Sequence, residues 1–311
     1  MPEITDKKLW MELQVETHPT LAEAVSNFLI EQGSHGVVQE ELPGTEQHKR
    51  ERIIAYFPKD RHFVSRRQKI RTYLLALRKI HRRSSRFQTR IIKQEEWAEA
   101  WKSNFKTIHV TPRLVIKPPW EEYPTKKGEV VVEIDPAMAF GTGTHPTTQM
   151  CLRVLERLIL SSPHSPSILD VGTGSGILAI ASRKMGAKKV LAIDIDPLAI
   201  ACARKNAAAN NIDSGIDFRT GFLGRLRRIF NIIVANLLPQ ELLSLAPYLA
   251  KRISPGGALI ISGLLRGQKK EVISVFAEQG LEVWRSLESK GWACLMLSRK
   301  NERDEASAIQ N

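Results

Sequence analysis

The chain has 311 residues, of which 42% are hydrophobic and 25% charged, so it is long enough for two domains of an ordinary soluble protein. No apolar run approaches the length of a membrane span and the N-terminal residues lack the apolar segment of an export signal, so we expect a cytoplasmic protein without membrane association. The three cysteines form no closely spaced pair, which favours a reducing compartment over a disulfide framework. We expect the chain to act as a monomer.

Residues 1–94 predict a small domain with the element order β-α-β-β-α-β. The expected elements are, in chain order, a strand at 8–16, a helix at 19–32, strands at 37–38 and 52–57, a basic helix at about 61–80 and a strand at 87–92. This order is that of a ferredoxin-like α+β domain.

The net charge of +13 is concentrated in residues 61–90, which contain eleven Lys and Arg residues and no acid. The rest of the chain has 35 basic residues (46 minus 11) and 33 acidic ones, a net charge of only +2. Two interpretations are open: a solvated helix face, or a patch that steers the protein toward RNA or an RNA-rich particle.

Residues 95–128 are predicted to be a linker with an aromatic helix. Trp97, Trp101 and Phe105 are spaced by four residues and lie on one helical face. We interpret these aromatics as packing between two domains rather than as a platform for a ligand. At the other end of the chain, the polar residues 300–311 are expected to form a disordered tail.

Residues 129–299 alternate between strand-like and helix-like patterns, which predicts an α/β, doubly wound, Rossmann-like domain with a seven-stranded, mostly parallel sheet. The expected strands are 130–134, 167–171, 189–194, 216–219, 230–235, 257–262, 281–285 and 292–298.

Three glycines at alternate positions, Gly172, Gly174 and Gly176, follow the strand that ends at Asp170 and open a helix. Their spacing is shorter than that of the dinucleotide-binding turn, which packs a helix N-terminus against a pyrophosphate. The next strand ends at Asp194, whose carboxylate can accept hydrogen bonds from both hydroxyls of a ribose, whereas Asp196 suits the cap of the following helix. A ribose without phosphates points to S-adenosylmethionine (SAM) as the cofactor.

Another strand ends at Asn236, on the edge of the sheet where parallel strands bind ligands. Two leucines and no aromatic residue follow Asn236, so a planar base nitrogen is a poor acceptor and an aliphatic amine a better one. Residues 135–148 contain two glycines and four threonines and are expected to form a lid over the cofactor, with Thr147 or Thr148 capping the next helix. His145 has no partner at metal-ligand spacing, so we assign it no catalytic role and expect no metal.

Four segments together resemble the PrmA family, the SAM-dependent methyltransferases of large-subunit ribosomal protein eleven: Phe140–Thr148, Asp170–Gly176, Asp194–Pro197 and Val234–Leu237. The resemblance is clear over residues 95–299, and the FGTGTHPTT segment is more specific than the glycine turn. It implies contacts to SAM at Thr148, Gly172, Asp194 and Asn236. To this predicted SAM site we add Phe140, Gly141, Thr142, Gly174 and Gly176. We also predict that Asn236 is the catalytic residue and orients the amine or the methionine group. The resemblance further implies methylation of amino groups, on lysine side chains or at the N-terminus, of a ribosomal protein that the N-terminal domain positions.

The basic cluster departs from this expectation, because the implied substrate is itself basic and like charges oppose association. Residues 61–90 would then contact rRNA, or the substrate would differ. An RNA methyltransferase is therefore the first alternative, and a catalytically silent SAM- or RNA-binding factor is the second. Residues 219–222 lack the acid that related enzymes place near the adenine, so backbone contacts to that ring are expected.

Overall fold

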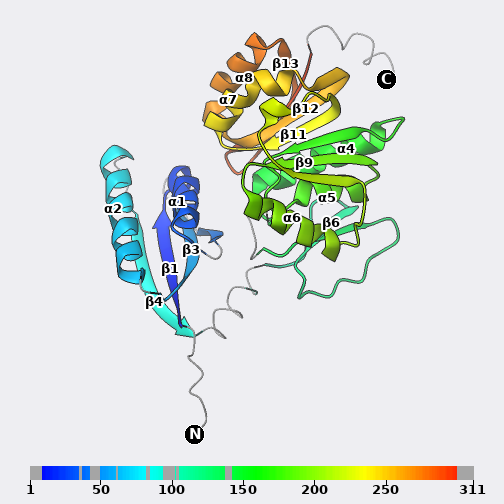
Figure 1. Cartoon of the computed structure of the whole chain (residues 1–311). Helices are drawn as coiled ribbons and strands as arrows, with labels where there is room; N and C mark the ends of the chain where they lie inside the picture. Colours follow the sequence, from blue (N-terminus) through cyan, green and yellow to red (C-terminus); the bar gives the residue numbers. More distant parts are fainter. Residues whose placement is uncertain are drawn as a thin grey trace. The chain divides into compact units, whose positions relative to one another are not determined.

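The computed structural model describes residues 9–34, 37–42, 50–60, 62–81, 85–93, 102, 105–136 and 142–299. The chain divides into two compact units, Met1–Lys106 and Thr107–Asn311, each with its own β-sheet structure (Figure 1). No helix in the described ranges combines the length and the apolar character needed to cross a bilayer.

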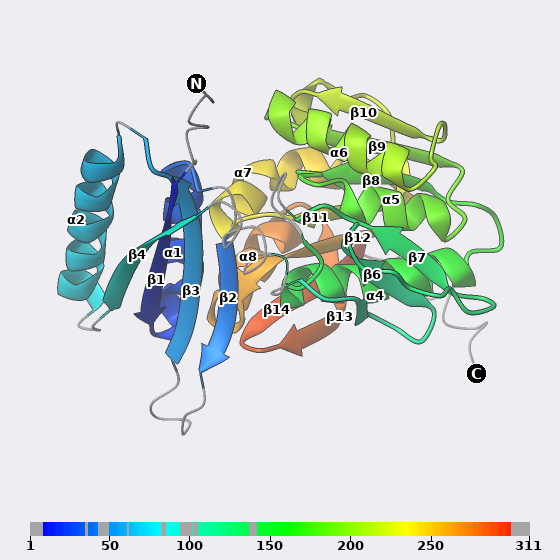
Figure 2. The same ribbon diagram turned by 90° about the horizontal axis from the view of Figure 1, so that it is seen from below.

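The first unit has the predicted element order β-α-β-β-α-β. Its elements are β1 (Leu9–Thr17), α1 (Pro19–Glu31), β2 (Val37–Leu42), β3 (Arg50–Pro58), α2 (Phe63–His81) and β4 (Arg86–Lys93). The four strands form an antiparallel sheet in the order β2-β3-β1-β4. Alternate residues of β1 and β3 face both helices, so α1 and α2 bury their apolar sides against one face of the sheet (Figure 2).

The second unit contains a seven-stranded sheet in the order β10-β9-β8-β11-β12-β14-β13, which confirms the predicted doubly wound architecture. The first five of these strands are parallel, and β14 runs antiparallel to both of its neighbours. The elements of this sheet and its cover are α4 (Pro146–Ser161), β8 (Ser167–Val171), α5 (Ile177–Lys184), β9 (Lys189–Asp194), α6 (Pro197–Ala209), β10 (Ile216–Thr220), β11 (Phe230–Asn236), α7 (Pro239–Ala250), β12 (Ile253–Leu265), α8 (Lys269–Glu278), β13 (Leu281–Ser289) and β14 (Trp292–Arg299).

The strand predicted at 130–134 forms, as β7 (Val130–Glu133), but not in this sheet. It pairs with β6 (Leu114–Lys117), which in turn pairs with β5 (Ile108–His109), in a separate three-stranded sheet. The prediction was wrong because apolar alternation identifies a strand without specifying its partner. Two of these strands also lie where we expected only a linker, and the second unit begins at Thr107. The predicted aromatic residues Trp97 and Trp101 and the tail 300–311 lie outside the described residues.

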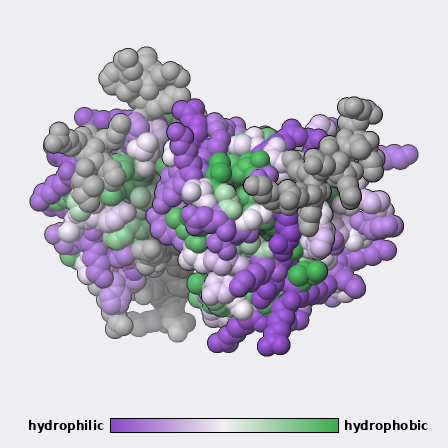
Figure 3. All heavy atoms as spheres, turned by 90° about the horizontal axis from the view of Figure 1, so that it is seen from above, coloured by the Kyte–Doolittle hydropathy of each residue, from purple (hydrophilic) through white to green (hydrophobic). Residues whose placement is uncertain are grey.

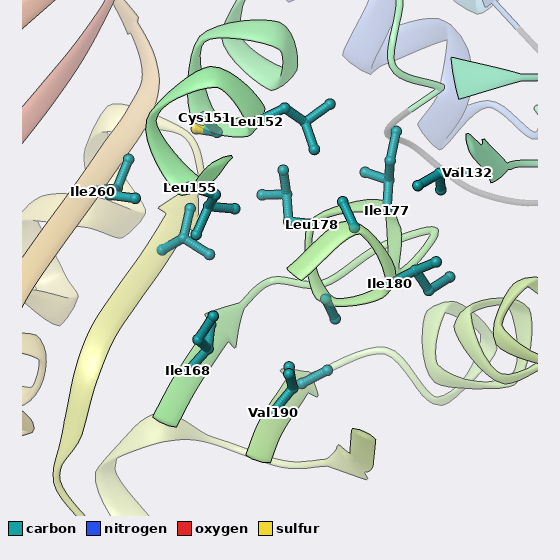
Figure 4. Close-up of a cluster of buried hydrophobic side chains, with 14 of the residues drawn as sticks. Val132, Cys151, Leu152, Leu155, Ile168, Ile177, Leu178, Ile180, Val190 and Ile260 are labelled. Atoms are coloured by element: carbon teal, nitrogen blue, oxygen red, sulfur yellow. The ribbon is translucent and has the colours of Figure 1, made fainter. Parts of the chain in front are cut away.

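The middle of the seven-stranded sheet is buried on both faces, which is why its inner strands, such as β8, β9 and β11, are largely apolar, whereas the edge strands β10 and β13 are not. Helices α4, α5 and α6 cover one face, where Leu155, Leu178 and Ile168 pack together (Figure 4), and α7 and α8 cover the other. Because side chains alternate along a strand, Asp170 follows Ile168 onto the face covered by α4 and α5. Asn236 reaches the same face from β11, two residues after Val234. Packing thus directs the polar residues at two neighbouring strand ends toward α4 and α5.

Candidate active site

The turn between β8 and α5 requires glycine at its predicted positions. Gly172, Gly174 and Gly176 have φ angles of 71°, 53° and 83°, a left-handed conformation that side chains disfavour. A Cβ on Gly172 would lie 2.3 Å from Leu237 Cδ2, and one on Gly176 would lie 2.9 Å from the Cβ of Ala203. Glycine is therefore required at Gly172 and Gly176 for two reasons, the left-handed backbone and the close packing of Leu237 and Ala203 against the turn.

The carboxylate of Asp194 faces this turn from the end of β9. Its Oδ2 accepts a hydrogen bond from the backbone N–H of Gly174 at 3.0 Å, and its Oδ1 accepts one from the N–H of Asp196 at 3.0 Å. These two bonds fix the orientation of the carboxylate and leave each oxygen a further lone pair for a ligand hydroxyl. Asp196 caps α6, as predicted, by accepting from the N–H of Leu198 at 2.8 Å, with Pro197 as the first helical residue.

Asn236 and Thr148, which are 88 residues apart in the sequence, meet at the same edge of the sheet. The Asn236 Nδ2 amide donates to Thr148 Oγ1 at 3.4 Å. Thr148 lies in the first turn of α4 and is only 1% exposed, whereas Asn236 is half-buried. Thr148 therefore orients one side of the Asn236 amide, and the side-chain carbonyl of Asn236 accepts no hydrogen bond from the described residues.

The described part of the predicted lid lies beside the glycine turn. A Cβ on Gly143 would be 3.0 Å from Ile177, the first residue of α5, and 3.0 Å from Ile116 of β6. The Thr142 hydroxyl hydrogen-bonds that of Thr144 at 2.8 Å. Two further residues of the predicted cofactor site, Phe140 and Gly141, lie outside the described residues.

The predicted cap of α4 is wrong. The helix begins at Pro146, and His145 rather than Thr147 or Thr148 is its N-cap, accepting from the N–H of Thr147 through Nδ1 at 3.3 Å. Proline at the first helical position fixes this start, because it needs no hydrogen-bond acceptor there. Burial, with a smaller effect of Lys290, lowers the pKa of His145 to about 4, so its ring is neutral at pH 7 and can act as the acceptor.

Asp170 is a buried acid beneath the glycine turn. It is 0% exposed, its Oδ2 accepts from the Thr173 hydroxyl at 2.6 Å, and its Oδ1 has no hydrogen-bond partner among the described residues. Burial, with a smaller contribution from the charge of Asp194, raises the pKa of Asp170 to about 7. The carboxyl is therefore partly protonated near neutral pH.

Two further residues position the site and were not predicted from the sequence. Asn206 of α6 is buried, and its amide donates to the carbonyl of Ser175 at 2.8 Å while its side-chain oxygen accepts from the N–H of Asp135 at 3.3 Å. It thus ties the glycine turn to the base of the lid. The sequence signal was a pair of asparagines, at positions 206 and 210, on the buried side of an alanine-rich helix.

Gly263 is the second such residue. It has a φ of +91° at an irregularity in the pairing of β12 with β14, and a Cβ there would lie 2.1 Å from the carbonyl oxygen of Leu237. Leu237 in turn donates its N–H to Ser262 at 3.1 Å. The bare backbone of Gly263 therefore lets the segment after Asn236 lie directly on β12. The signal in the sequence was Gly263 itself, a glycine inside the apolar run of residues 258–265.

Comparison with known proteins assigns the chain to a family. Residues 9–300 match the family described as "Ribosomal protein L11 methyltransferase (PrmA)". The chain belongs to this family. A "Ribosomal protein L11 methyltransferase" of Geotalea uraniireducens is 37% identical over 313 aligned residues, which cover 93% of this chain and 98% of that protein. Another of the same description, from Pelobacter propionicus, is 37% identical and covers 93% of this chain and 97% of its own length.

A solved structure is also similar to this chain. The crystal structure of a ribosomal protein L11 methylase from Lactobacillus delbrueckii subsp. bulgaricus is 36% identical, with a TM-score of 0.59. The match covers 63% of this chain and 100% of that one. The family resemblance that the sequence motifs predicted is confirmed along nearly the whole chain.

Proposed function

We propose that this chain transfers methyl groups from SAM to amino groups of ribosomal protein L11, on lysine side chains or at the N-terminal amine. The proposal rests on two hydrogen-bonded pairs of groups that lie at the same edge of the sheet. One pair is Asp194 with the glycine turn, and the other is Asn236 with Thr148. Family membership supports the same reaction.

The residues present fit SAM, which supplies an electrophilic methyl group on a sulfonium when bound. Asp194 would accept hydrogen bonds from the ribose hydroxyls, because its oxygens are already oriented by two backbone N–H groups. Gly172 and Gly174 would let the backbone lie against the ligand, and Gly143 would bring the lid loop close to the same turn. Thr148 would act indirectly, by orienting the amide of Asn236.

The chemistry required of the protein is alignment rather than strong acid–base catalysis. The attacking amine would have to be uncharged and in line with the carbon–sulfur bond that breaks as the new carbon–nitrogen bond forms, the thioether leaves and the amine then loses a proton to solvent. None of this needs a strong acid or base from the protein. The side-chain carbonyl of Asn236 can accept a hydrogen bond from the attacking amine and hold it in line. Leu237 and Leu238 follow Asn236, and an apolar surrounding lowers the pKa of an amine by disfavouring its charged form. No aromatic residue follows Asn236 to stack on a planar base.

A second candidate reaction is methylation of RNA, favoured by the basic residues of α2. The two reactions are separated by incubating the enzyme with methyl-tritiated SAM and either purified ribosomal protein L11 or protein-free rRNA. We expect label in the protein, with mass spectrometry locating it on amino groups. Label in the rRNA alone would overturn the proposal.

A further inference from the structure

The outer face of α2 carries five cations that make no ion pair. They are all exposed, and within the part of the chain that the structure describes no carboxylate pairs with any of them: Arg67, Lys69, Arg71, Arg78 and Lys79. The helix contains no acidic residue. Arg67, Arg71 and Arg78 are spaced by four and seven residues, so their side chains form one stripe along the helix.

The neighbouring Arg66 shows what a structural arginine of this helix looks like. It pairs with Asp60 at 3.1 Å, donates from Nε to the carbonyl of Gln32 at 3.0 Å, and lies over the ring of Phe57. Its guanidinium is thus used to fix the fold. The cations of the outer face make no comparable contacts with the described residues, so those contacts do not assign them a role in the stability of the unit.

The outer face is electrostatically unfavourable for an isolated helix. Like charges four residues apart, as at Arg67 and Arg71, cost about 0.2–0.5 kcal/mol, and a cation near the N-terminus opposes the helix dipole. A bound polyanion would offset both effects. Arginines suit phosphate groups in particular, because the planar guanidinium donates two parallel hydrogen bonds.

We propose that the outer face of α2 binds the phosphate backbone of RNA, without reading its sequence. The described residues of this face include no aromatic side chain on which a base would stack, which favours backbone contacts over base recognition. Binding of RNA here is separate from methyl transfer, because α2 belongs to the first unit and the candidate active site to the second.

A membrane surface fits this face less well. An interfacial helix needs a broad apolar side, but Ile70, Leu74 and Leu77 of α2 are buried in the core. Among the large apolar side chains of α2 whose burial is described, Val64 and Leu75 are the exposed ones, at 75% and 49%, and they are about 16 Å apart along the helix axis. Isolated exposed apolar residues are common on protein surfaces. Figure 3 shows the same mixture of hydrophilic and apolar side chains on one side of the molecule.

The test compares two triple variants of the full chain. Arg67→Gln, Arg71→Gln and Arg78→Gln remove three charges from the outer face of α2. The matched control removes three exposed charges from the second unit, by Lys188→Gln, Lys189→Gln and Lys270→Gln. Affinity for a labelled single-stranded RNA of about 20 nucleotides is measured by fluorescence anisotropy between about 50 and 300 mM salt.

We expect the α2 variant to reduce the slope of log affinity against log salt by about 2, since each lost phosphate contact removes about 0.7 for a single strand. At about 0.1 M salt this corresponds to roughly hundred-fold weaker binding. The control should bind like the wild type, and both variants should keep the wild-type melting temperature and methylate free ribosomal protein at the wild-type rate.

Three results would overturn the proposal. The first is that the wild type does not bind RNA at low salt, and the second is that both variants lose the same amount of RNA affinity. The third is that, in a parallel assay with vesicles containing phosphatidylserine, the wild type binds the vesicles and not the RNA. Because methyl transfer to the free protein is measured separately, failure of RNA binding leaves the proposed reaction standing.

Discussion

The carboxyl edge of the seven-stranded sheet and the outer face of α2 both gather polar residues, but in opposite ways. At the sheet edge, Asp194, Thr148 and Asn236 are each held by a hydrogen bond to the backbone or to one another. On α2, the exposed arginines have no such partner in the described structure. The side chains of the first arrangement are oriented by hydrogen bonds before any ligand arrives, and the second is an array of exposed charges without ion-pair partners among the described residues.

This difference indicates what kind of ligand each of the two surfaces can bind. Orienting a reacting group requires side chains whose rotamers are already fixed, because ordering them on binding costs free energy. A phosphate backbone requires only charge of the right sign at the right spacing, because its contacts are repeated and tolerant. The experiments below test whether the sheet edge depends on its fixed geometry.

The largest effect is expected for Asp194→Ala. The variant loses the acceptor of the ribose hydroxyls and leaves the N–H of Gly174 without its partner, and hydrogen bonds to a charged group contribute about 1.5–3 kcal/mol each. SAM affinity measured by calorimetry should fall by about a hundred-fold or more. Asp196→Ala is the control, since it removes only a helix cap worth about 1 kcal/mol and should bind SAM normally. Equal SAM affinity in the two variants would contradict our assignment of Asp194.

The second-largest effect is expected for Gly263→Ala. A Cβ at this position collides with the backbone of Leu237, so the segment carrying Asn236 must move. We expect a loss of about 2–4 kcal/mol in unfolding free energy, from the left-handed backbone and the overpacking together. The rate of methyl transfer should also fall. Gly280→Ala provides the comparison, since Gly280 has a φ of +77° but open space around its Cα. A normal transfer rate in Gly263→Ala would show that the close approach does not position the site.

A smaller effect, about ten-fold in kcat/KM, is expected for Asn236→Ala, which removes one orienting hydrogen bond. Asn231 lies at the other end of the same strand, where its side chain accepts from the N–H of Ser167 at 2.9 Å. Asn231→Ala should therefore reduce stability while leaving kcat/KM unchanged. If Asn236→Ala kept both full turnover and full SAM affinity, Asn236 would have no role in the reaction.

The last prediction concerns the pH dependence of stability and the carboxyl of Asp170. Its pKa is raised in the folded protein to about 7 from an ordinary value of 3.8, so the folded state holds the proton more tightly than the unfolded state. The resulting stabilisation is complete below pH 3.8 and is lost as the pH rises through about 7, by at most about 1.4 kcal/mol per pH unit. Asp170→Asn should remove this dependence in urea titrations between about pH 5 and 8. Parallel pH profiles of wild type and variant would show that Asp170 is ionised throughout.

Local patterns predicted the architecture and part of the site. Alternation and helical spacing predicted the order of elements in the first unit and the strands of the seven-stranded sheet in the second. The spacing of Gly172, Gly174 and Gly176 predicted a turn that only glycine can form. The sequence also predicted Asp196 as the N-cap of α6, because an acidic residue directly before a proline is a local signal for the start of a helix. The N-cap of α4 was not predicted correctly, because His145, Thr147 and Thr148 are all possible hydrogen-bond acceptors until the start of the helix is known.

The sequence by itself determined which segments become strands, helices and turns, because these depend on the periodicity and backbone preferences of neighbouring residues. Only the tertiary structure decided that β7 joins a separate sheet, that Asn236 meets Thr148, and that Gly263 lies against Leu237. These contacts join residues far apart in the chain, and they exist because sheet order and helix packing bring the strand ends together. The burial that raises the pKa of Asp170 has the same origin, since it is set by the helices that cover β8 and not by the residues beside Asp170 in the sequence.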